Sequence, residues 1–368
     1  MHVLIACDSF KDALDAENVC SAIARGLQQA HPGIGVTEMP LSDGGEGVLD
    51  ILRKALALKS QALAVSDPLG RPVTASFGLS ADGTALVEMA TASGLQLLSQ
   101  AERNPLLTST YGTGQLLADA RARGAKTALL AIGGSATNDA GIGMAAALGW
   151  QFRDAGGKAV RPDGGNLQQI ATILPPPQPL FEKVEVLCDV TNPLYGPNGA
   201  AWIYGPQKGG TKESLTHLDE GLRHIAALVE SQLGRPSLAE VPGAGAAGGL
   251  GFGGMAFLNA TLKRGIEMVL DLVGFDAAVQ RADLVITGEG HIDGQSLQGK
   301  LIQGVCARAG KTPVIALCGK LSASEADVRA VGLKAAYSIN KVQRPLADML
   351  AATGANLEAT AAGLPLTD

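Results

Sequence analysis

The chain has 368 residues, of which 46% are hydrophobic and 17% charged, and its formal net charge is -6 at pH 7. This length predicts two domains or one large one, while the acidic balance and the lack of a Lys/Arg cluster argue against a nucleic-acid partner. No uncharged apolar stretch is long enough to span a bilayer, so no membrane partner is expected. The 48 glycines and few aromatic residues are typical of an α/β enzyme with glycine turns at its strand ends.

The five cysteines are scattered along the chain and form no Cys-x-x-Cys pair. Such a set predicts reduced, buried thiols, as in the cytosol. The chain opens on an apolar run at residues 3–7, with no basic or long apolar leader before it. We therefore expect a cytoplasmic protein without a signal peptide.

Strand and helix patterns alternate at the start of the chain. Apolar runs predict strands at 2–7 and 33–39, and helical patterns follow them at 16–29 and 48–58. In the first helix Val19, Ile23 and Leu27 recur every four residues on one face. This order predicts the beginning of a parallel, doubly wound sheet of the Rossmann or flavodoxin-like type.

The pattern changes after the turn 67–70. Two β-rich runs at 73–79 and 84–89 flank Ala81-Asp82-Gly83 and predict an antiparallel hairpin, which we interpret as the entry to a second domain. Helices are expected at 92–98 and 112–124. The tail returns to alternation, with strands at 282–287 and 313–317 and helices at 300–309 and 325–331. We predict a discontinuous Rossmann-like α/β domain, 1–65 plus 275–368, and an inserted α/β domain with a mixed sheet, 66–274.

A glycine-rich loop joins the predicted strand 127–132 to a small-residue helix at 144–148. It contains Gly133, Gly134, Ser135, Thr137 and Asn138. Glycines let a ligand approach the backbone, and a helix N-terminus offers N–H groups to an anion. The loop therefore predicts an anion site, although a tight strand-to-helix turn that binds nothing has the same residues.

Five predicted strands end in loops that carry a carboxylate, and ligands of open α/β sheets bind at that edge. The carboxylates are Asp8, Asp43, Asp139, Asp189, and Glu289 with Asp293. Together they suit a polyphosphate and Mg²⁺, whereas each alone also suits a turn or a helix cap. Lys11, Lys208 and Arg71 are candidates for binding phosphate or a substrate carboxylate, or are solvated surface residues.

The segment Gly243–Gly248 fits Gly-x-Gly-x-x-Gly letter by letter. Pro242 rather than a strand precedes it, and no βαβ unit surrounds it. We therefore do not interpret it as a working dinucleotide site.

The loops together resemble those of the bacterial glycerate kinases of the glyoxylate and galactarate pathways, the type-1 family. The resemblance covers residues 1 to about 340 and rests on an ordered set of motifs. These are Asp8-Ser9-Phe10-Lys11, Ser42-Asp43-Gly44-Gly45-Glu46-Gly47, Gly133-Gly134-Ser135-Ala136-Thr137-Asn138-Asp139, Cys188-Asp189-Val190-Thr191-Asn192-Pro193-Leu194, Gly205-Pro206-Gln207-Lys208-Gly209 and Thr287-Gly288-Glu289-Gly290. It implies ATP-dependent phosphorylation of D-glycerate, most often to 2-phosphoglycerate, by two α/β domains with the site in their cleft and Mg²⁺ bound with the nucleotide.

The roles of single residues are hypotheses from their chemistry. Asp189 is the first choice for the general base, and Asp43 is the second choice or a ligand of the substrate hydroxyl. Lys11 and Lys208 would hold the glycerate carboxylate or the transferring phosphate, with Asp8, Ser9 and Arg71 also at the substrate. The loop Gly133–Asn138, together with Gly288, would bind ATP, and Glu289 and Asp293 would hold Mg²⁺ or its waters.

Several alternatives stay open. Within enzymes these are a glycerate 3-kinase, a kinase of another small hydroxy acid, and an NAD(P)-dependent oxidoreductase that would depend on the Gly243 match. A non-catalytic ligand-binding regulator is an alternative of another class. The sequence leaves the oligomeric state open, a homo-oligomer included.

Overall fold

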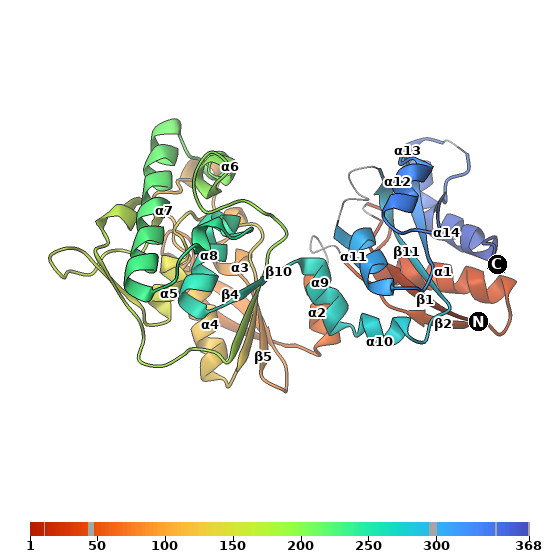
Figure 1. The fold of residues 1–368 in the computed structure, drawn as a ribbon, viewed down its shortest axis with the longest axis horizontal. Coiled ribbons are helices and arrows are strands. Elements are labelled where there is room, and N and C mark those ends of the chain that lie inside the picture. The colour runs from red at the N-terminus through yellow and green to blue at the C-terminus, as the bar shows by residue number, and fades with distance from the viewer. Residues whose placement is uncertain (11, 43–47, 294–299, 343, 367–368) are drawn as a thin grey trace. The chain divides into compact units, whose positions relative to one another are not determined.

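The computed structural model describes residues 1–368 except 11, 43–47, 294–299, 343 and 367–368. Internal contacts divide the chain into two compact units (Figure 1). Unit 1 comprises Met1–Ala55 and Arg264–Asp368, and unit 2 comprises Leu56–Lys263. We propose that they are the discontinuous and inserted domains expected from the sequence, with boundaries at 55/56 and 263/264 in place of 65/66 and 274/275. Within the described ranges, no helix has the length and apolar character needed to cross a membrane.

Unit 1 contains a five-stranded sheet in which all neighbouring strands are parallel. The strand order is β13-β12-β11-β1-β2. The strands are β1 (His2–Cys7), β2 (Gly35–Glu38), β11 (Leu284–Ile292), β12 (Val314–Leu321) and β13 (Ala335–Ser338). The helices are α1 (Ala16–Ala30), α2 (Val48–Ala55), α9 (Gly265–Leu272), α10 (Phe275–Val279), α11 (Lys300–Ala309), α12 (Glu325–Ala330), α13 (Leu346–Ala351) and α14 (Thr353–Ala362). The chain runs from β1 to β2 on one side and returns to β11 on the other, so the order reverses at β1.

Apolar residues cover both faces of this sheet, as expected for parallel strands. In β1 the alternate residues Val3, Ile5 and Cys7 pack in one core cluster with side chains of α1 and α14. The intervening residues Leu4 and Ala6 are fully buried as well. Because successive side chains of a strand point to opposite faces, helices must cover both sides of the sheet. The predicted doubly wound α/β fold is confirmed for this unit.

Unit 2 contains a six-stranded mixed sheet in the order β10-β9-β6-β5-β4-β3. Strands β10, β9, β6 and β5 are mutually parallel, whereas β4 is antiparallel to both β5 and β3. The strands are β3 (Lys59–Ser66), β4 (Pro72–Leu79), β5 (Thr84–Glu88), β6 (Thr127–Ala131), β9 (Lys183–Leu187) and β10 (Thr261–Lys263), with a separate hairpin of β7 (Gln151–Arg153) and β8 (Thr172–Leu174). The helices are α3 (Ala90–Ser93), α4 (Tyr111–Ala122), α5 (Ile142–Ala147), α6 (Ala200–Tyr204), α7 (Lys212–Leu233) and α8 (Ala246–Leu258). The predicted β4–β5 hairpin and mixed sheet are confirmed.

Several predicted elements differ in length from the structure; the strand expected at 313–317, for example, continues to Leu321 as β12. The helix expected at 92–98 ends at Ser93, because Gly94 has an extended backbone (φ -86°, ψ 153°) and starts a short 3-10 turn. The strand expected at 282–287 continues to Ile292, so Glu289 and His291 belong to β11 and not to a loop. Gly288 lies inside this strand, where an added Cβ would be 2.2 Å from the Leu317 carbonyl oxygen. The glycine therefore permits close contact between β11 and β12 and does not end the strand.

Candidate functional site

The loop between β6 and α5, residues 132–141, lies at the carboxyl edge of the unit 2 sheet. Gly133 and Gly134 are exposed, while the residues from Ser135 to Ala140 are buried. Between Gly133 and Asp139, Ala136 is the one residue whose backbone N–H has a partner among the described residues, the Ser93 carbonyl at 3.0 Å. The space beside Gly133 is open, since an added Cβ would meet no atom within 4 Å. The unpaired N–H groups at the exposed Gly133–Gly134 end of the loop are suited to binding an anion.

Lys208 lies beneath this loop and is almost completely buried, with 1% of its surface exposed. Its Nζ donates hydrogen bonds to Ser135 Oγ and to the Thr137 carbonyl oxygen, both at 2.6 Å. Burial lowers the pKa of Lys208 to about 7, and the charge of Asp139 opposes this shift. The side chain therefore joins the loop to the segment after α6. It is not the solvated lysine that the sequence also allowed.

Asp139 links the N-terminal ends of α4 and α5. Its Oδ2 accepts from the backbone N–H of Thr110 (2.7 Å), the Thr110 hydroxyl (2.8 Å) and the N–H of Gly143 (3.2 Å). Its Oδ1 accepts from the N–H of Gly141 at 3.1 Å. Burial raises the pKa of Asp139, while these hydrogen bonds favour the ionised form. This carboxylate fixes the end of the loop and is fully engaged in doing so.

The glycine-rich segment 243–249 packs against the same loop. Ala247, Gly248 and Gly249 all have positive φ values, of 53°, 70° and 87°. An added Cβ on Gly248 would lie 2.0 Å from the Thr137 carbonyl oxygen. The Ala140 N–H donates to the Gly248 carbonyl at 3.0 Å. Of the glycines that match Gly-x-Gly-x-x-Gly in the sequence, Gly248 thus allows backbone-to-backbone contact with the loop.

Two carboxylates follow or end the strands on either side of β6. Asp189 is half-buried and follows β9, whose Leu187 is the register partner of Ala131 in β6. Glu88 ends β5 opposite the same Ala131. Neighbouring strands are about 4.8 Å apart, so both residues come to the loop's edge of the sheet. The sequence analysis missed Glu88, although it is a carboxylate at the end of a predicted strand.

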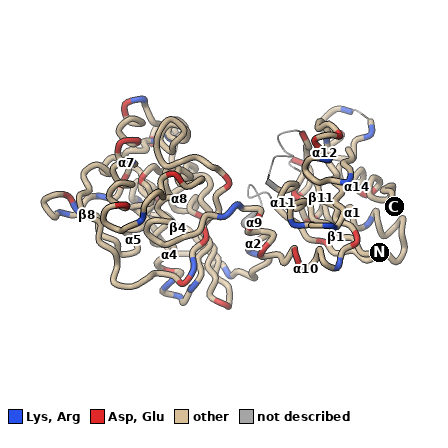
Figure 2. The backbone as a smooth tube through the Cα atoms, viewed as in Figure 1, with Lys and Arg blue, Asp and Glu red and all other residues tan. Residues whose placement is uncertain are grey.

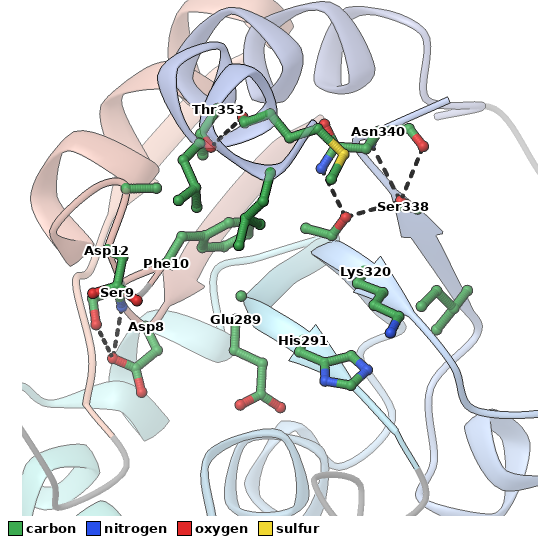
Figure 3. Close-up of a pocket in the computed structure, with 17 residues that line it drawn as sticks. Asp8, Ser9, Phe10, Asp12, Glu289, His291, Lys320, Ser338, Asn340 and Thr353 are labelled. Atoms are coloured by element: carbon green, nitrogen blue, oxygen red, sulfur yellow. Dashed lines mark hydrogen bonds between the residues drawn. The ribbon is translucent and has the colours of Figure 1, made fainter. Parts of the chain in front are cut away.

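A second cluster of predicted residues lines a pocket of about 790 Å³ in unit 1 (Figure 3). The pocket lies at the carboxyl ends of β1, β11, β12 and β13. Its polar lining is Asp8, Ser9, Asp12, Glu289, His291, Lys320, Ser338, Asn340 and Thr353. An adjoining pocket of about 680 Å³ shares Asp8, Ser9, Phe10, Asp12 and Ala13 and also contacts Ser42. The segment after β1 thus has a pocket on each side.

Asp8 and Glu289 come from neighbouring strands of this pocket. Cys7 pairs with Gly288 in the β1–β11 register, and the Asp8 N–H donates to the Gly288 carbonyl at 2.9 Å. Asp8 Oδ1 also accepts from the Ser9 N–H at 2.6 Å and from its hydroxyl at 3.2 Å. Figure 3 shows the carboxyl groups of Asp8 and Glu289 pointing to the same side of the pocket.

Asp293 directly follows the end of β11. Residues four apart in a strand are about 13 Å apart at Cα, so the structure separates Asp293 from Glu289. In the described residues there is no group of three or more His, Cys, Asp or Glu side chains placed to hold a metal. Two carboxylates completed by phosphate oxygens still suit Mg²⁺, which commonly keeps only one or two protein ligands.

The remaining predicted residues have other positions. Arg71 Nε donates to Asp67 at 2.6 Å and its Nη1 donates to Glu102 at 2.5 Å, and these hydrogen bonds raise its pKa. The guanidinium is thus engaged in a local ion-pair network. Lys11 and Asp43 lie outside the described residues.

Acidic and basic residues are mixed over both units in the part of the chain drawn in colour (Figure 2). Buried polar atoms without a partner also occur at both sheets. They include Oγ1 of Thr137, both amide atoms of Asn138, and Oγ1 of Thr287 in β11. Since unpaired buried polar groups are costly, those of the loop are further groups that a ligand or water can satisfy.

Comparison with known proteins gives one consistent result. The family model described as the glycerate kinase family matches residues 3–365. A glycerate kinase from Bacillus subtilis (strain 168) is 45% identical, with 98% of this chain and 96% of the relative covered. A glycerate 2-kinase from Escherichia coli (strain K12) is 42% identical, with 92% and 90% covered. A crystal structure of a protein provisionally named glycerate kinase 2, from Salmonella typhimurium LT2, has a TM-score of 0.84 and 40% identity, with 98% of this chain and 96% of that chain covered.

Proposed function

The chain belongs to the glycerate kinase family and phosphorylates a hydroxyl group of glycerate, and we propose that ATP is the donor and 2-phospho-D-glycerate the product. The resemblance predicted from the loop motifs is thereby confirmed. Family membership also supports a kinase over the regulator and the oxidoreductase that the sequence left open. The 2-position is proposed because the E. coli relative is named a glycerate 2-kinase.

The observation that carries the proposal is the unpaired backbone of the loop Gly133–Asp139 above the buried Lys208. Phosphoryl transfer requires little covalent help from the protein. It requires positioning and neutralisation of the phosphate charge. Free N–H groups and the protonated form of Lys208 supply positive electrostatic potential at this loop. We propose that this loop binds the phosphoryl group that is transferred.

Asp189 is proposed as the general base. It would accept the proton of the glycerate hydroxyl while the oxygen of that hydroxyl attacks the γ-phosphorus and ADP leaves. Its position two residues after β9, the strand next to β6, supports this role. Glu88 occupies the matching position on the other side of β6 and is a second candidate. Asp43 stays an alternative predicted from the sequence.

Substrate and metal roles are proposed for the unit 1 residues. Asp8 and Glu289 have the hard oxygen donors that Mg²⁺ prefers and come from adjacent strands, so they fit a Mg²⁺ that also binds nucleotide phosphates. Bound there, Mg²⁺ would neutralise phosphate charge. Asp293 stays a candidate for contacting a metal-bound water. Ser9, Lys11 and Arg71 stay predictions for substrate binding, and Gly288 stays a prediction for the nucleotide.

A coupled assay tests the proposal. Purified protein is incubated with D-glycerate and ATP–Mg²⁺, and enolase, pyruvate kinase and lactate dehydrogenase report the product. Enolase accepts 2-phosphoglycerate and not its 3-isomer, so NADH oxidation without phosphoglycerate mutase is expected. A signal that requires the mutase would show a 3-kinase and refute the proposed product. ADP formation only with another hydroxy acid would refute glycerate, and activity only with another phosphoryl donor would refute ATP.

A further inference from the structure

The unit 1 pocket lies at a topological switch point. Strand β1 has β2 on one side and β11 on the other, and the connections from β1 and β11 therefore leave the sheet in opposite directions. In open α/β sheets this divergence leaves a crevice outside the carboxyl ends of the strands, where ligands bind. Asp8 and Ser9 follow β1, and Glu289 and Gly290 lie in β11, so both sides of the switch point line the pocket.

The pocket is large, and one part of its wall is apolar. Its volume of about 790 Å³ falls in the range of small-molecule and cofactor sites, whereas a three-carbon acid would fill little of it. Phe10, Leu346, Met349 and Leu350 form the apolar part, and the last three belong to α13. Leu346 is 67% exposed. Apolar side chains around an open pocket suit a flat, weakly polar ring system.

Hydrogen bonds also fix a polar edge of the pocket at the ends of β12 and β13 (Figure 3). Asn340 Nδ2 donates to the Gly319 carbonyl at 2.9 Å, and Asn340 Oδ1 accepts from Asn356 Nδ2 at 2.9 Å. The Asn340 N–H donates to Ser338 Oγ at 3.2 Å. In the described part of the chain, the second amide proton and second Oδ1 lone pair of Asn340 have no partner. A heterocycle with adjacent donor and acceptor groups can use both.

The charge of the lining disfavours a small anion as the main occupant. Asp8, Asp12 and Glu289 line the pocket together with Lys320 and His291. A glycerate carboxylate would meet these carboxylates at close range, whereas hydroxyl groups of a sugar can donate hydrogen bonds to them. Asp or Glu side chains recognise ribose hydroxyls in this way in other switch-point sites.

We propose that this pocket holds the nucleoside part of ATP. The base would lie against α13 and the Ser338–Asn340 edge, and the ribose and metal-bound phosphates would lie toward Asp8 and Glu289. This inference rests on the proposed function and adds to it the site at which the phosphoryl donor binds. The pocket recognises a neutral purine nucleoside by apolar contact and an amide, and the bound Mg²⁺ would offset the repulsion between the carboxylates and the phosphates.

Leu350→Trp tests the inference because it fills the pocket from α13. Ala347→Trp is the matched control, since Ala347 is exposed on the same helix and does not line the pocket. Binding of ADP–Mg²⁺ is measured by calorimetry in the absence of glycerate. Binding of inorganic tripolyphosphate is measured in the same way, as a probe that has phosphates but no nucleoside. The KM values for ATP and for glycerate are measured separately. Leu350→Trp is expected to raise the ADP Kd and the KM for ATP at least tenfold. The tripolyphosphate affinity and the KM for glycerate should stay within twofold, as should every value for Ala347→Trp.

Several results would overturn the inference. A raised KM for glycerate with unchanged ADP affinity would assign the pocket to the acid, and equal weakening of ADP and tripolyphosphate would assign it to phosphate. If Leu350→Trp changed none of these Kd and KM values, the pocket would bind neither the nucleotide nor glycerate. If Leu350→Trp does not fold, Met349→Ala replaces it as the test variant. This substitution removes part of the apolar wall of the pocket and should weaken the binding of ADP without changing that of tripolyphosphate. Because ADP binding is measured without turnover, failure of the inference is distinguishable from failure of the wild-type coupled assay.

Discussion

Gly248→Ala is expected to destabilise unit 2 and to impair catalysis at the same time. Gly248 is where the glycine-rich segment comes close to the backbone of the loop 132–141. The substitution adds one methyl group, whose carbon would lie 2.0 Å from the Thr137 carbonyl oxygen and 2.6 Å from Asn138 Cα. Both are backbone atoms, so no side-chain rotation relieves the overlap. The loop has to move away from its position above Lys208.

The expected cost has two parts. Gly248 has φ +70°, and the left-handed conformation costs an L-residue about 1–2 kcal/mol. Overpacking a well-packed site costs about 1–3 kcal/mol more. The free energy of unfolding of unit 2 should therefore fall by about 2–5 kcal/mol in total. A displaced loop should lower kcat/KM for ATP by about tenfold to hundredfold, the effect of a small misplacement at a catalytic site.

Gly234→Ala is the matched control. Gly234 caps α7 with φ +64°, and an added Cβ would meet nothing within 4 Å. It should show the conformational cost alone, with kcat/KM unchanged. Guanidinium titrations followed by tryptophan fluorescence give the unfolding midpoints. Both tryptophans of the chain, Trp150 and Trp202, belong to unit 2 and report on it alone. A Gly248→Ala midpoint no lower than that of Gly234→Ala, with wild-type kcat/KM, would refute the idea that this glycine positions the loop.

Three further predictions concern charge. Asp139→Asn should lower the unfolding free energy of unit 2 by about 2–4 kcal/mol, because an amide NH₂ would face the N–H groups of Thr110 or Gly141; a wild-type fluorescence midpoint would contradict this. Burial lowers the pKa of Lys208 to about 7 in the fold, whereas it is near 10.4 in the unfolded chain. Between these two pH values only the unfolded chain holds the proton. The free energy of unfolding of unit 2 should therefore rise as the pH rises through this window. Lys208→Met should remove that gain when midpoints at pH 7 and 9.5 are compared, and an unchanged difference would show that the lysine is not its source. Removal of Mg²⁺ with EDTA should weaken ADP binding at least tenfold and leave adenosine binding unchanged, because carboxylates line the unit 1 pocket; calorimetry showing Mg²⁺-independent ADP binding would refute this.

The sequence predicted the central parallel strands because these are buried on both faces and appear as short, continuous apolar runs. Val3–Cys7 and Thr127–Ile132 are such runs. The edge strands β10 and β13 are less buried and were not predicted. The loops after the apolar runs were identified as candidate sites because glycines, hydroxyls and carboxylates gather where an apolar run stops. The same rule would have found Glu88 if the end of the hairpin strand had been treated like the others. Its omission was an error of application and not a lack of signal.

Other features depend on contacts between distant segments, which the sequence does not display. Lys208 follows a glycine and a proline and resembles a surface lysine, and its burial arises from the packing of its segment against Ser135 and Thr137. Gly248 matched a dinucleotide motif that lacks its strand, and its real contact is with a loop more distant in sequence. The length of β11 was underestimated because Gly288 resembles a strand end, while the structure needs it for contact with Leu317.

The loop of unit 2 and the pocket of unit 1 both lie where parallel strands end, but they present different chemical groups. The loop of unit 2 presents unpaired N–H groups over a buried lysine and therefore favours an anion. The pocket of unit 1 presents Asp8, Asp12 and Glu289, and therefore favours hydroxyl groups and a cation. A nucleotide carries both kinds of group, since its nucleoside is neutral and its phosphates are anionic. The carboxylates of unit 1 therefore suit a Mg²⁺ bound with the nucleotide, as proposed above.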